Sequence, residues 1–378
     1  KVYYTYTING AEPADPDGTG SFSSIGAGPG FDSPYIDLSG IGLNPGDVLR
    51  IKIQGYETDR EPTAVQYITY TIVDNCNTPT FITNNPGTYN NDTAVTIQGE
   101  AGTAIYYTVD GTQPQIDYAT GNAGNANTTK MSTGSSFTLT QNHGSGNTVV
   151  RAVAWQAAKG KSTELSGNYI LQCATPTMTP GSDASTATIN GTISSNTTGT
   201  AIKFTKSAAG LDPVTNGTTG TSFTVDQNLD DNESSGKTVI QAYASRTGYL
   251  DSTVASRNFY LYCATPNVSV SAGTYTSTFY TTISNNQSGS DLKYSFSSAP
   301  TRSTGTAYPG GSGVNITEIR TLYATSSKTG YRTSSSDTIS YTLKCQTPTF
   351  SHSSGGDYFP ERSINLYCST SGASIHYK

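Results

Sequence analysis

One four-residue pattern recurs along this chain at intervals the size of a protein domain. Cys-x-Thr-Pro begins at four positions, which are Cys76, Cys173, Cys263 and Cys345. Successive copies lie 97, 90 and 82 residues apart. A pattern repeated at that spacing indicates a tandem array of similar modules. The functional question is therefore what an array does, before any search for a single active site.

The residues between these cysteines repeat one order of strand signals. A short apolar signal follows each Thr-Pro, at residues 80–81, 177–178, 267–268 and 349–350. A second signal follows a turn, at residues 2–5, 104–108, 201–205, 291–295 and 374–377. A third leads into a Gly-Tyr turn at 248–249 and 330–331, with Gly55-Tyr56 as a looser equivalent. A closing strand then runs into the next cysteine.

Composition supports a fold made of strands. The 378 residues are 34% hydrophobic and 13% charged, with 39 Gly and 26 Tyr. Alternating apolar positions, abundant Thr, Tyr and Val, and Gly/Asn/Ser/Pro turns are typical of β-strands. No apolar pattern of period 3.6 is long enough for a helix. Several short strands per 80 to 100 residues predict an all-β chain of tandem β-sandwiches.

The cysteine spacing also predicts the module boundaries. We expect complete modules at 76–172, 173–262 and 263–344, flanked by partial modules at 1–75 and 345–378. The first partial module begins inside the second strand signal, and the last one stops in the equivalent strand. The simplest expectation is a window of a longer repetitive chain.

Charge and hydropathy exclude two classes of function. The net charge of −6 and the absence of a basic run argue against nucleic-acid binding, which needs clustered Lys and Arg. No stretch of 18 apolar residues is present, so we expect no membrane span. The sequence starts at Lys1 without a signal peptide, and we expect any targeting segment to be removed or not shown.

Several repeated motifs resemble a known family. They are Thr-Pro-x-Phe at 78–81, Gly-Thr-Tyr at 87–89 and 273–275, a strand and turn at 104–114, and a strand and Gly-Tyr turn at 242–252. This series is similar to the chitobiase/β-hexosaminidase C-terminal-type domain. The resemblance implies a fibronectin III-like or Ig-like sandwich in a secreted or surface protein. It implies an accessory or structural role and supplies no catalytic residue and no cofactor.

The junctions between modules contain proline and no long linker. Proline fixes φ and holds the preceding residue extended, and no junction has a Gly/Ser stretch of ten or more residues. Short, stiff junctions predict a semi-rigid rod. The plainer interpretation is that Thr-Pro starts an edge strand, where proline is tolerated. Both interpretations can hold together.

The fifth cysteine suggests one disulfide. Cys368 has no counterpart in the other modules, and it lies with Cys345 on two strands joined by the turn at Gly355-Gly356. A Cys345–Cys368 disulfide is geometrically plausible. The other three cysteines would then be unpaired and buried, or linked to other chains. No Cys-x-x-Cys or histidine cluster indicates a metal site.

Catalytic and ligand-binding signals are weak. His143, His352 and His376 lack a Ser/Asp or Cys partner in sequence, and His376 is more simply a strand-face residue. The acidic pairs Asp15/Asp17 and Asp230/Asp231 offer oxygen ligands for calcium, but their spacing matches no known calcium-binding loop. The plainer interpretation is a solvated turn, because turns favour Asp intrinsically. Asn-x-Ser/Thr sequons are frequent, and glycosylation is an option if the protein is secreted.

Aromatic residues raise one binding hypothesis. Trp155 and exposed tyrosines offer rings on which sugars stack, whereas alternating tyrosines usually pack a sheet face. The adjacent Tyr106 and Tyr107 place one ring on each face. Glycans are therefore a candidate partner, while packing within the sheets is the ordinary role of these aromatic rings.

The sequence favours a non-catalytic extracellular or cell-surface fibre, stalk or adhesin-like rod. The alternative is a carbohydrate-binding or spacer region of a large secreted glycoside hydrolase. A sharper hypothesis is self-assembly, in which the C-terminal strands of one copy complete the N-terminal module of the next. The candidate assembly segments contain Val2, Tyr3, Tyr4, Phe350 and Ile375. The strand signals at residues 2–5 and 374–377 would take the same place in the completed module, which counts against a simple version of this assembly.

Overall fold

The structure is a computed structural model that describes residues 2–16, 40–352, 355 and 363–378. The described residues form 32 strands and one four-residue helix. The chain divides into two compact units. Unit 1 contains residues 1–172 and 247–250, and unit 2 contains residues 173–246 and 251–378. No described helix is long and apolar enough to cross a membrane.

Residues 1–75 of unit 1 form one antiparallel sheet in the order β1-β2-β3. Its strands are β1 (Val2–Ile8), β2 (Val48–Gly55) and β3 (Gln66–Thr71). The pairing register places Leu49 opposite Tyr70 and Ile51 opposite Ile68, so these four side chains share one face. All six residues of β3 are exposed.

Residues 76–172 form a two-layer sandwich within unit 1. A five-stranded sheet has the order β10-β7-β12-β13-β5, a three-stranded sheet has the order β11-β6-β4, and β8-β9 is a separate hairpin. The strands are β4 (Thr80–Thr83), β5 (Gly87–Tyr89), β6 (Thr93–Gln98), β7 (Ala104–Thr108), β8 (Ile116–Asp117), β9 (Asn122–Ala123), β10 (Thr129–Ser132), β11 (Ser136–Leu139), β12 (Thr148–Trp155) and β13 (Leu165–Leu171).

Residues 173–262 of unit 2 repeat this architecture. A five-stranded sheet has the order β15-β21-β20-β17-β18 and a three-stranded sheet has the order β14-β16-β19. The elements are β14 (Thr177–Thr179), β15 (Asp183–Ser185), β16 (Ile189–Ser194), β17 (Ala201–Ser207), α1 (Pro213–Asn216), β18 (Thr218–Thr219), β19 (Ser222–Val225), β20 (Thr238–Ser245) and β21 (Ala255–Leu261).

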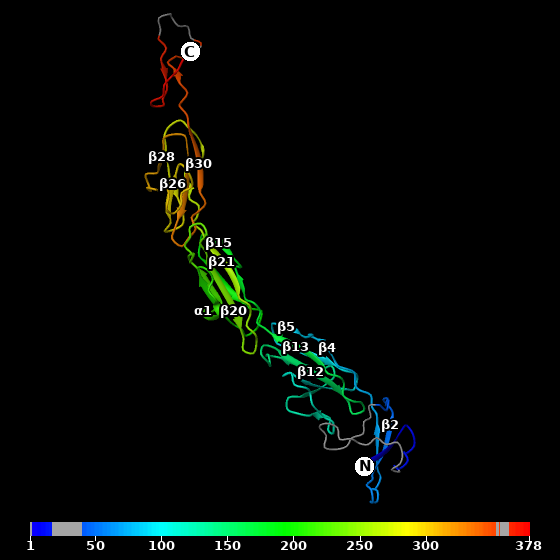
Figure 1. The fold of residues 1–378 in the computed structure, drawn as a ribbon. Helices are drawn as coiled ribbons and strands as arrows, with labels where there is room; N and C mark the ends of the chain where they lie inside the picture. The colour runs from blue at the N-terminus through cyan, green and yellow to red at the C-terminus, as the bar shows by residue number, and fades with distance from the viewer. Residues whose placement is uncertain (1, 17–39, 353–354, 356–362) are drawn as a thin grey trace. The chain divides into compact units, whose positions relative to one another are not determined.

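Residues 263–344 repeat it again, with a covering layer of two short pairs, β22-β25 and β24-β28. Figure 1 shows β26, β28 and β30 close together in this module. The strands are β22 (Asn267–Val268), β23 (Gly273–Tyr275), β24 (Phe279–Thr281), β25 (Ile283–Ser284), β26 (Asp291–Ser295), β27 (Thr306–Ala307), β28 (Val314–Ile316), β29 (Arg320–Ser327) and β30 (Asp337–Leu343). Residues 345–378 contain one pair, β31 (Thr349–Phe350) and β32 (Leu366–Tyr367).

One aromatic side chain organises the core of each complete sandwich. It comes from the last strand, four residues before a cysteine, as Tyr169, Phe259 and Tyr341, and it is at most 1% exposed. A ring from the covering sheet packs against it in each case. Phe81 lies 5.7 Å from Tyr169, Phe223 lies 5.0 Å from Phe259, and Phe279 lies 5.2 Å from Tyr341. Edge-to-face and tilted ring pairs of this kind add to the free energy of burial.

A buried serine fixes the turn after the long central strand in each sandwich. The hydroxyl oxygens of Ser162, Ser252 and Ser334 accept from the backbone N–H of residues 154, 244 and 326, each at 2.9 Å. Each hydroxyl also donates to the next carbonyl along the chain. Thr63 repeats the first contact with the N–H of Gly55, at 2.9 Å. This repeated contact makes residues 55, 154, 244 and 326 structurally equivalent.

Two sequence expectations need correction. The strand expected at 374–377 is absent, since these residues lie in no described strand. In the complete sandwiches the equivalent strand pairs with the long central strand that follows it, and the described residues of 345–378 contain no such partner. The single-turn helix α1 was not expected. Asp212 caps it by accepting from the N–H of Val214 at 2.9 Å, and Pro213 begins it.

Candidate functional site

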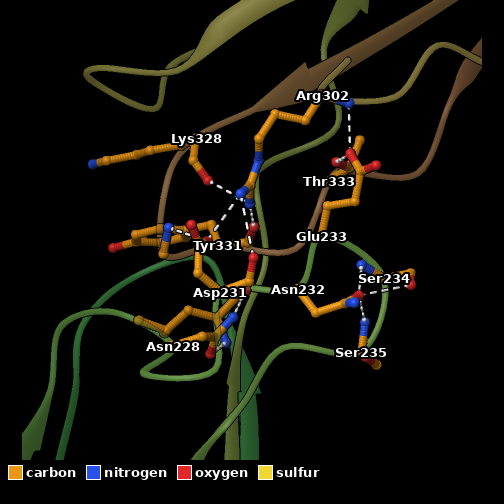
Figure 2. A network of polar contacts seen from close by, with 12 residues as sticks. Asn228, Asp231, Asn232, Glu233, Ser234, Ser235, Arg302, Lys328, Tyr331 and Thr333 are labelled. Atoms are coloured by element: carbon orange, nitrogen blue, oxygen red, sulfur yellow. Dashed lines mark hydrogen bonds and ion pairs between the residues drawn. The ribbon is translucent and has the colours of Figure 1, made fainter. Parts of the chain in front are cut away.

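A dense polar network joins two sandwiches within unit 2. Residues 226–236, in the loop between β19 and β20, meet residues 328–333, in the turn after β29. Arg302, from the loop between β26 and β27, lies beside both (Figure 2). We call these residues the junction site.

The centre of the junction site is a backbone clasp. The Asn228 N–H donates to the carbonyl of Gly330 at 2.6 Å, and the Arg332 N–H donates to the carbonyl of Leu261 at 2.8 Å. The side-chain amide of Asn228 also bonds both backbone groups of Leu261, each at 2.8 Å. The Cys263 N–H then donates to the carbonyl of Arg332 at 2.8 Å. Asn228 is 2% exposed, so its amide is a buried connector that donates one of these bonds and accepts the other.

Glycine is required at the tip of the docking turn. Gly330 has φ +77°, a left-handed conformation that residues with a side chain rarely adopt. A Cβ atom at this position would lie 2.8 Å from Cβ of Gln227. The turn therefore approaches its neighbour more closely than any other residue would allow.

Arg302 is the charged centre of the network, as Figure 2 shows. Its guanidinium donates to the carboxylate of Asp231 at 3.0 Å and to the carbonyls of Lys328 and Tyr331 at 3.1 and 2.6 Å. The same Asp231 oxygen accepts the N–H of Gly330 at 2.6 Å. A planar guanidinium with several donors suits such a multipoint contact better than lysine does.

Two more side chains extend the junction site. The Glu233 carboxylate accepts the backbone N–H of Arg302 at 2.5 Å and the hydroxyl of Thr333 at 3.1 Å. The Arg332 guanidinium lies over the rings of Tyr260 and Tyr262, 4.3 and 5.3 Å from their centroids. It also donates to the carbonyls of Ser235 and Gly236, each at 2.8 Å. Cation–π contact and hydrogen bonds together restrict rotation between the two sandwiches.

Unit 1 contains the same type of clasp. The Asn142 N–H donates to the carbonyl of Gly248 at 2.7 Å, and the Leu250 N–H donates to the carbonyl of Leu171 at 2.9 Å. The Tyr249 hydroxyl contacts the Asp92 carboxylate at 2.5 Å. The Gly160 N–H likewise donates to the carbonyl of Asp74 at 2.6 Å. The clasp is therefore a recurring device.

Sequence reasoning found half of this device. It singled out the Gly-Tyr turns at 248–249 and 330–331 and missed the Gln-Asn pairs at 141–142 and 227–228 that receive them. The pairs were detectable, since both stand in the loop that precedes a long central strand. The sequence offers Asp231 as a calcium ligand or a solvated turn residue, and the structure pairs it with Arg302.

The residues expected in assembly segments lie in two different settings. Tyr3 is buried, and Val2 and Tyr4 are half-buried, in a strand that already pairs with β2. Phe350 is 69% exposed on β31. Ile375 is half-buried outside any described strand. Their role in assembly stays a prediction.

The residues considered for catalysis or metal binding do not converge. His143 and His376 are exposed, and His352 contacts the neighbouring Ser351 hydroxyl at 2.8 Å. Among the described residues, no three His, Cys, Asp or Glu side chains form a cluster that holds a metal. Asp15 contacts Lys52 at 2.6 Å, and Asp17 lies outside the described residues.

Trp155 is half-buried and packs against neighbouring rings. Its ring meets Tyr118 edge to face at 5.9 Å, and Tyr106 at 6.2 Å. A Cβ atom on Gly121 would lie 3.1 Å from the Trp155 ring, so the loop backbone closes against it. Tyr106 is fully buried and Tyr107 is 9% exposed, and Tyr107 stacks on Phe137 at 4.1 Å. These rings therefore serve packing.

All five cysteines are free thiols in the structure. Cys76, Cys173 and Cys263 are buried, and burial raises the pKa of each thiol. Cys345 is exposed and Cys368 is half-buried, with its thiol 3.3 Å from the carbonyl of Gln346. The Cys345–Cys368 disulfide stays a prediction.

The Cys263 thiol gives a prediction about pH. Burial raises its pKa to about 11, from an ordinary value of 9.0. The folded chain therefore holds this proton more tightly than the unfolded chain does. The free energy of unfolding should not change through this group below about pH 9, and it should fall as the pH rises from about 9 to 11. Iodoacetamide at about pH 8 should label exposed Cys345 well before Cys263. Peptide mass spectrometry reads both, and equal labelling rates in the folded chain would contradict the expectation.

No protein-family model matches the sequence, and no curated protein matches it. Solved structures do match. Extracellular domains 3–5 of Drosophila OTK are 8% identical, with a TM-score of 0.23, covering 71% of this chain and 97% of that one. Domains FN1–FN3 of chicken CNTN1 are 11% identical, with a TM-score of 0.21, covering 72% and 100%.

A bacterial structure matches as well. The fibronectin(III)-like modules of Clostridium thermocellum CbhA are 14% identical, with a TM-score of 0.17, covering 48% of this chain and 93% of that one. The sheet topology itself shows a tandem array of β-sandwiches. At these TM-scores the matches carry no conclusion about this chain.

Proposed function

We propose that this chain is a non-catalytic structural protein of the cell exterior, built as a fibre, stalk or adhesin-like rod. The junction site is the observation that carries the proposal. It joins two sandwiches through backbone clasps, Arg302 and Arg332, where a flexible tether would need no such contacts. A protein that sets distance and resists bending needs fixed angles between its modules.

The resemblance to chitobiase-type domains supports the same role. Such modules accompany other domains of secreted and surface proteins, and they act as spacers or supports. The rival role is the carbohydrate-binding or spacer region of a secreted glycoside hydrolase, with glycans as partners. The packing of the Trp155 ring against Tyr106, Tyr118 and the backbone at Gly121 supports the structural role. Copies that join end to end through strand addition would lengthen the array.

Single-molecule pulling of the full chain tests this function. Each complete sandwich should rupture as a separate event, because each has its own core. A sandwich of about 90 residues should lengthen the chain by roughly 300 Å, at 3.3–3.6 Å per extended residue. Smooth extension without ruptures would contradict a mechanical role. Selective binding on a glycan array, together with weak ruptures, would favour the rival role.

A further inference from the structure

One surface turn carries the same three-residue motif in two neighbouring sandwiches of unit 2. The motif is Asn-x-Ser/Thr, and its two copies are Asn196-Thr197-Thr198 and Asn286-Gln287-Ser288. Each copy begins two residues after a strand of the covering layer, β16 or β25, and each is followed by a glycine with a φ of +71° or +75°. The copies are 90 residues apart, as are Cys173 and Cys263, so the motif repeats with the module.

The middle residue of each copy is fixed to the protein. The Thr197 hydroxyl oxygen accepts the backbone N–H of Ala174 at 2.8 Å, and the Gln287 amide oxygen accepts the backbone N–H of Ala264 at 2.9 Å. The carbonyl of each middle residue also accepts a hydroxyl from three residues further on, at 3.2 and 2.9 Å. The residues on both sides of each middle residue are exposed, namely Asn196, Thr198, Asn286 and Ser288. The turn therefore presents an asparagine and a hydroxyl residue at the surface.

Asn-x-Ser/Thr is the acceptor sequence for N-linked glycans when its middle residue is not proline. Other copies of the motif in this chain have a different setting. Three of them lie within paired strands, at Asn190, Asn267 and Asn315. In two more, the asparagine amide nitrogen donates a hydrogen bond to a neighbouring side chain, at Asn127 and Asn216. The turns at 196–198 and 286–288 lie outside every described strand and helix, as a surface acceptor site requires.

We propose that Asn196 and Asn286 are sites of N-glycosylation. The carboxamide nitrogen of each asparagine forms a bond to C1 of the first sugar of a lipid-linked oligosaccharide. The bond from C1 to the lipid diphosphate breaks, and the diphosphate leaves with the electron pair while the amide nitrogen loses one proton. The inference rests on the proposed function, because this modification occurs on surface loops of secreted proteins. Glycans are then a covalent part of the chain and not a bound partner.

Each site lies beside the beginning of its sandwich. Ala174 and Ala264, which the two turns bind, directly follow the buried Cys173 and Cys263. One glycan therefore stands at the same place on each of these two sandwiches, next to the segment that enters it. Because a glycan is bulky and solubilising, it shields that segment from other chains.

Peptide mass spectrometry of the full chain, produced in its native host, tests the two sites. Peptide-N-glycosidase in heavy-oxygen water converts a glycosylated asparagine to a heavy aspartate and leaves an unmodified asparagine unchanged. The peptides that contain Asn196 and Asn286 should both carry this label after treatment. A portion of the same digest without the enzyme should carry none.

Two pairs of matched variants separate N-glycosylation from other changes at these asparagines. Thr198→Ala and Ser288→Ala remove the hydroxyl that the motif needs and keep its asparagine, whereas Thr198→Ser and Ser288→Thr keep the whole motif. The substituted residues are exposed, so the variants should fold, which circular dichroism checks. Each alanine variant should lose the label at its own site alone, and the two conservative variants should keep both labels.

Label that persists at its own site in an alanine variant, or that is missing from a conservative variant, would overturn the inference. The place from which the chain is recovered separates this inference from the proposed function. An unlabelled chain at the cell surface overturns the inference and leaves the proposed function standing. An unlabelled chain retained inside the cell overturns both.

Discussion

Replacing Phe259 with alanine is expected to destabilise the sandwich of residues 173–262 by about 3–5 kcal/mol. The Phe259 ring is fully buried and packs 5.0 Å from Phe223 of the opposite sheet. Its removal loses the transfer free energy of the ring and leaves a cavity between the sheets. Hydrogen exchange of β20 and β21 in increasing urea measures the effect.

The chain supplies an internal control for this substitution. Its single tryptophan, Trp155, lies in the sandwich of residues 76–172, so Trp155 fluorescence reports the unfolding of another module. Its transition should not move, because distant sites in separate cores contribute independently. Phe259→Leu, which keeps most of the apolar volume, should cost less than the alanine variant. Equal shifts of the Trp155 transition and the β21 transition would show that the cores are not separate.

Replacing Arg302 with alanine is expected to weaken the junction site by about 2 kcal/mol. The Arg302 side chain is 28% exposed, and its guanidinium makes four charge-assisted hydrogen bonds. Its removal leaves the carbonyls of Lys328 and Tyr331 without this donor. The amides of Asn228 and Gly330, which bond across the junction, should then exchange roughly 30-fold faster with deuterium. The cores of both sandwiches should keep their protection.

Arg257→Ala is the matched control for the junction. It removes the same charge from an exposed arginine whose guanidinium donates to the carbonyl of its own neighbour Ser256. Arg302→Lys should give an intermediate result, because lysine keeps the charge without the planar fork. Unchanged exchange at Gly330 in Arg302→Ala, or faster exchange in Arg257→Ala, would show that Arg302 does not hold the junction.

The strands were predictable from sequence because their signals are local. Alternation places Val150, Ala152 and Ala154 on one face of β12, and the repeat carries the same pattern to β20 and β29. The core aromatic residues also follow the repeat, four positions before Cys173, Cys263 and Cys345. The failure at 374–377 has the converse cause, since a strand signal becomes a strand only where another strand pairs with it.

The junction site was less predictable because its contacts are long-range. Asp231 and Arg302 are 71 residues apart, and Asp231 and Gly330 are 99 residues apart. Asp231 and Glu233 stand in an Asp/Asn/Ser-rich loop, where turn chemistry explains them without a partner. Only the fold shows that this loop faces the turn at 328–333. The Gly-Tyr pattern marked that turn, while its docking surface carries no apolar periodicity.

The most direct test of the central claim is a distance distribution across the junction site. Spin labels on unnatural amino acids at the exposed positions Thr224 and Tyr280 avoid the native cysteines and place one label on each sandwich of unit 2. Pulsed electron paramagnetic resonance on the full chain should give one narrow distance distribution, which broadens in Arg302→Ala. A broad distribution in the wild type would mean that the sandwiches move freely, and it would contradict a structural array held by its junctions.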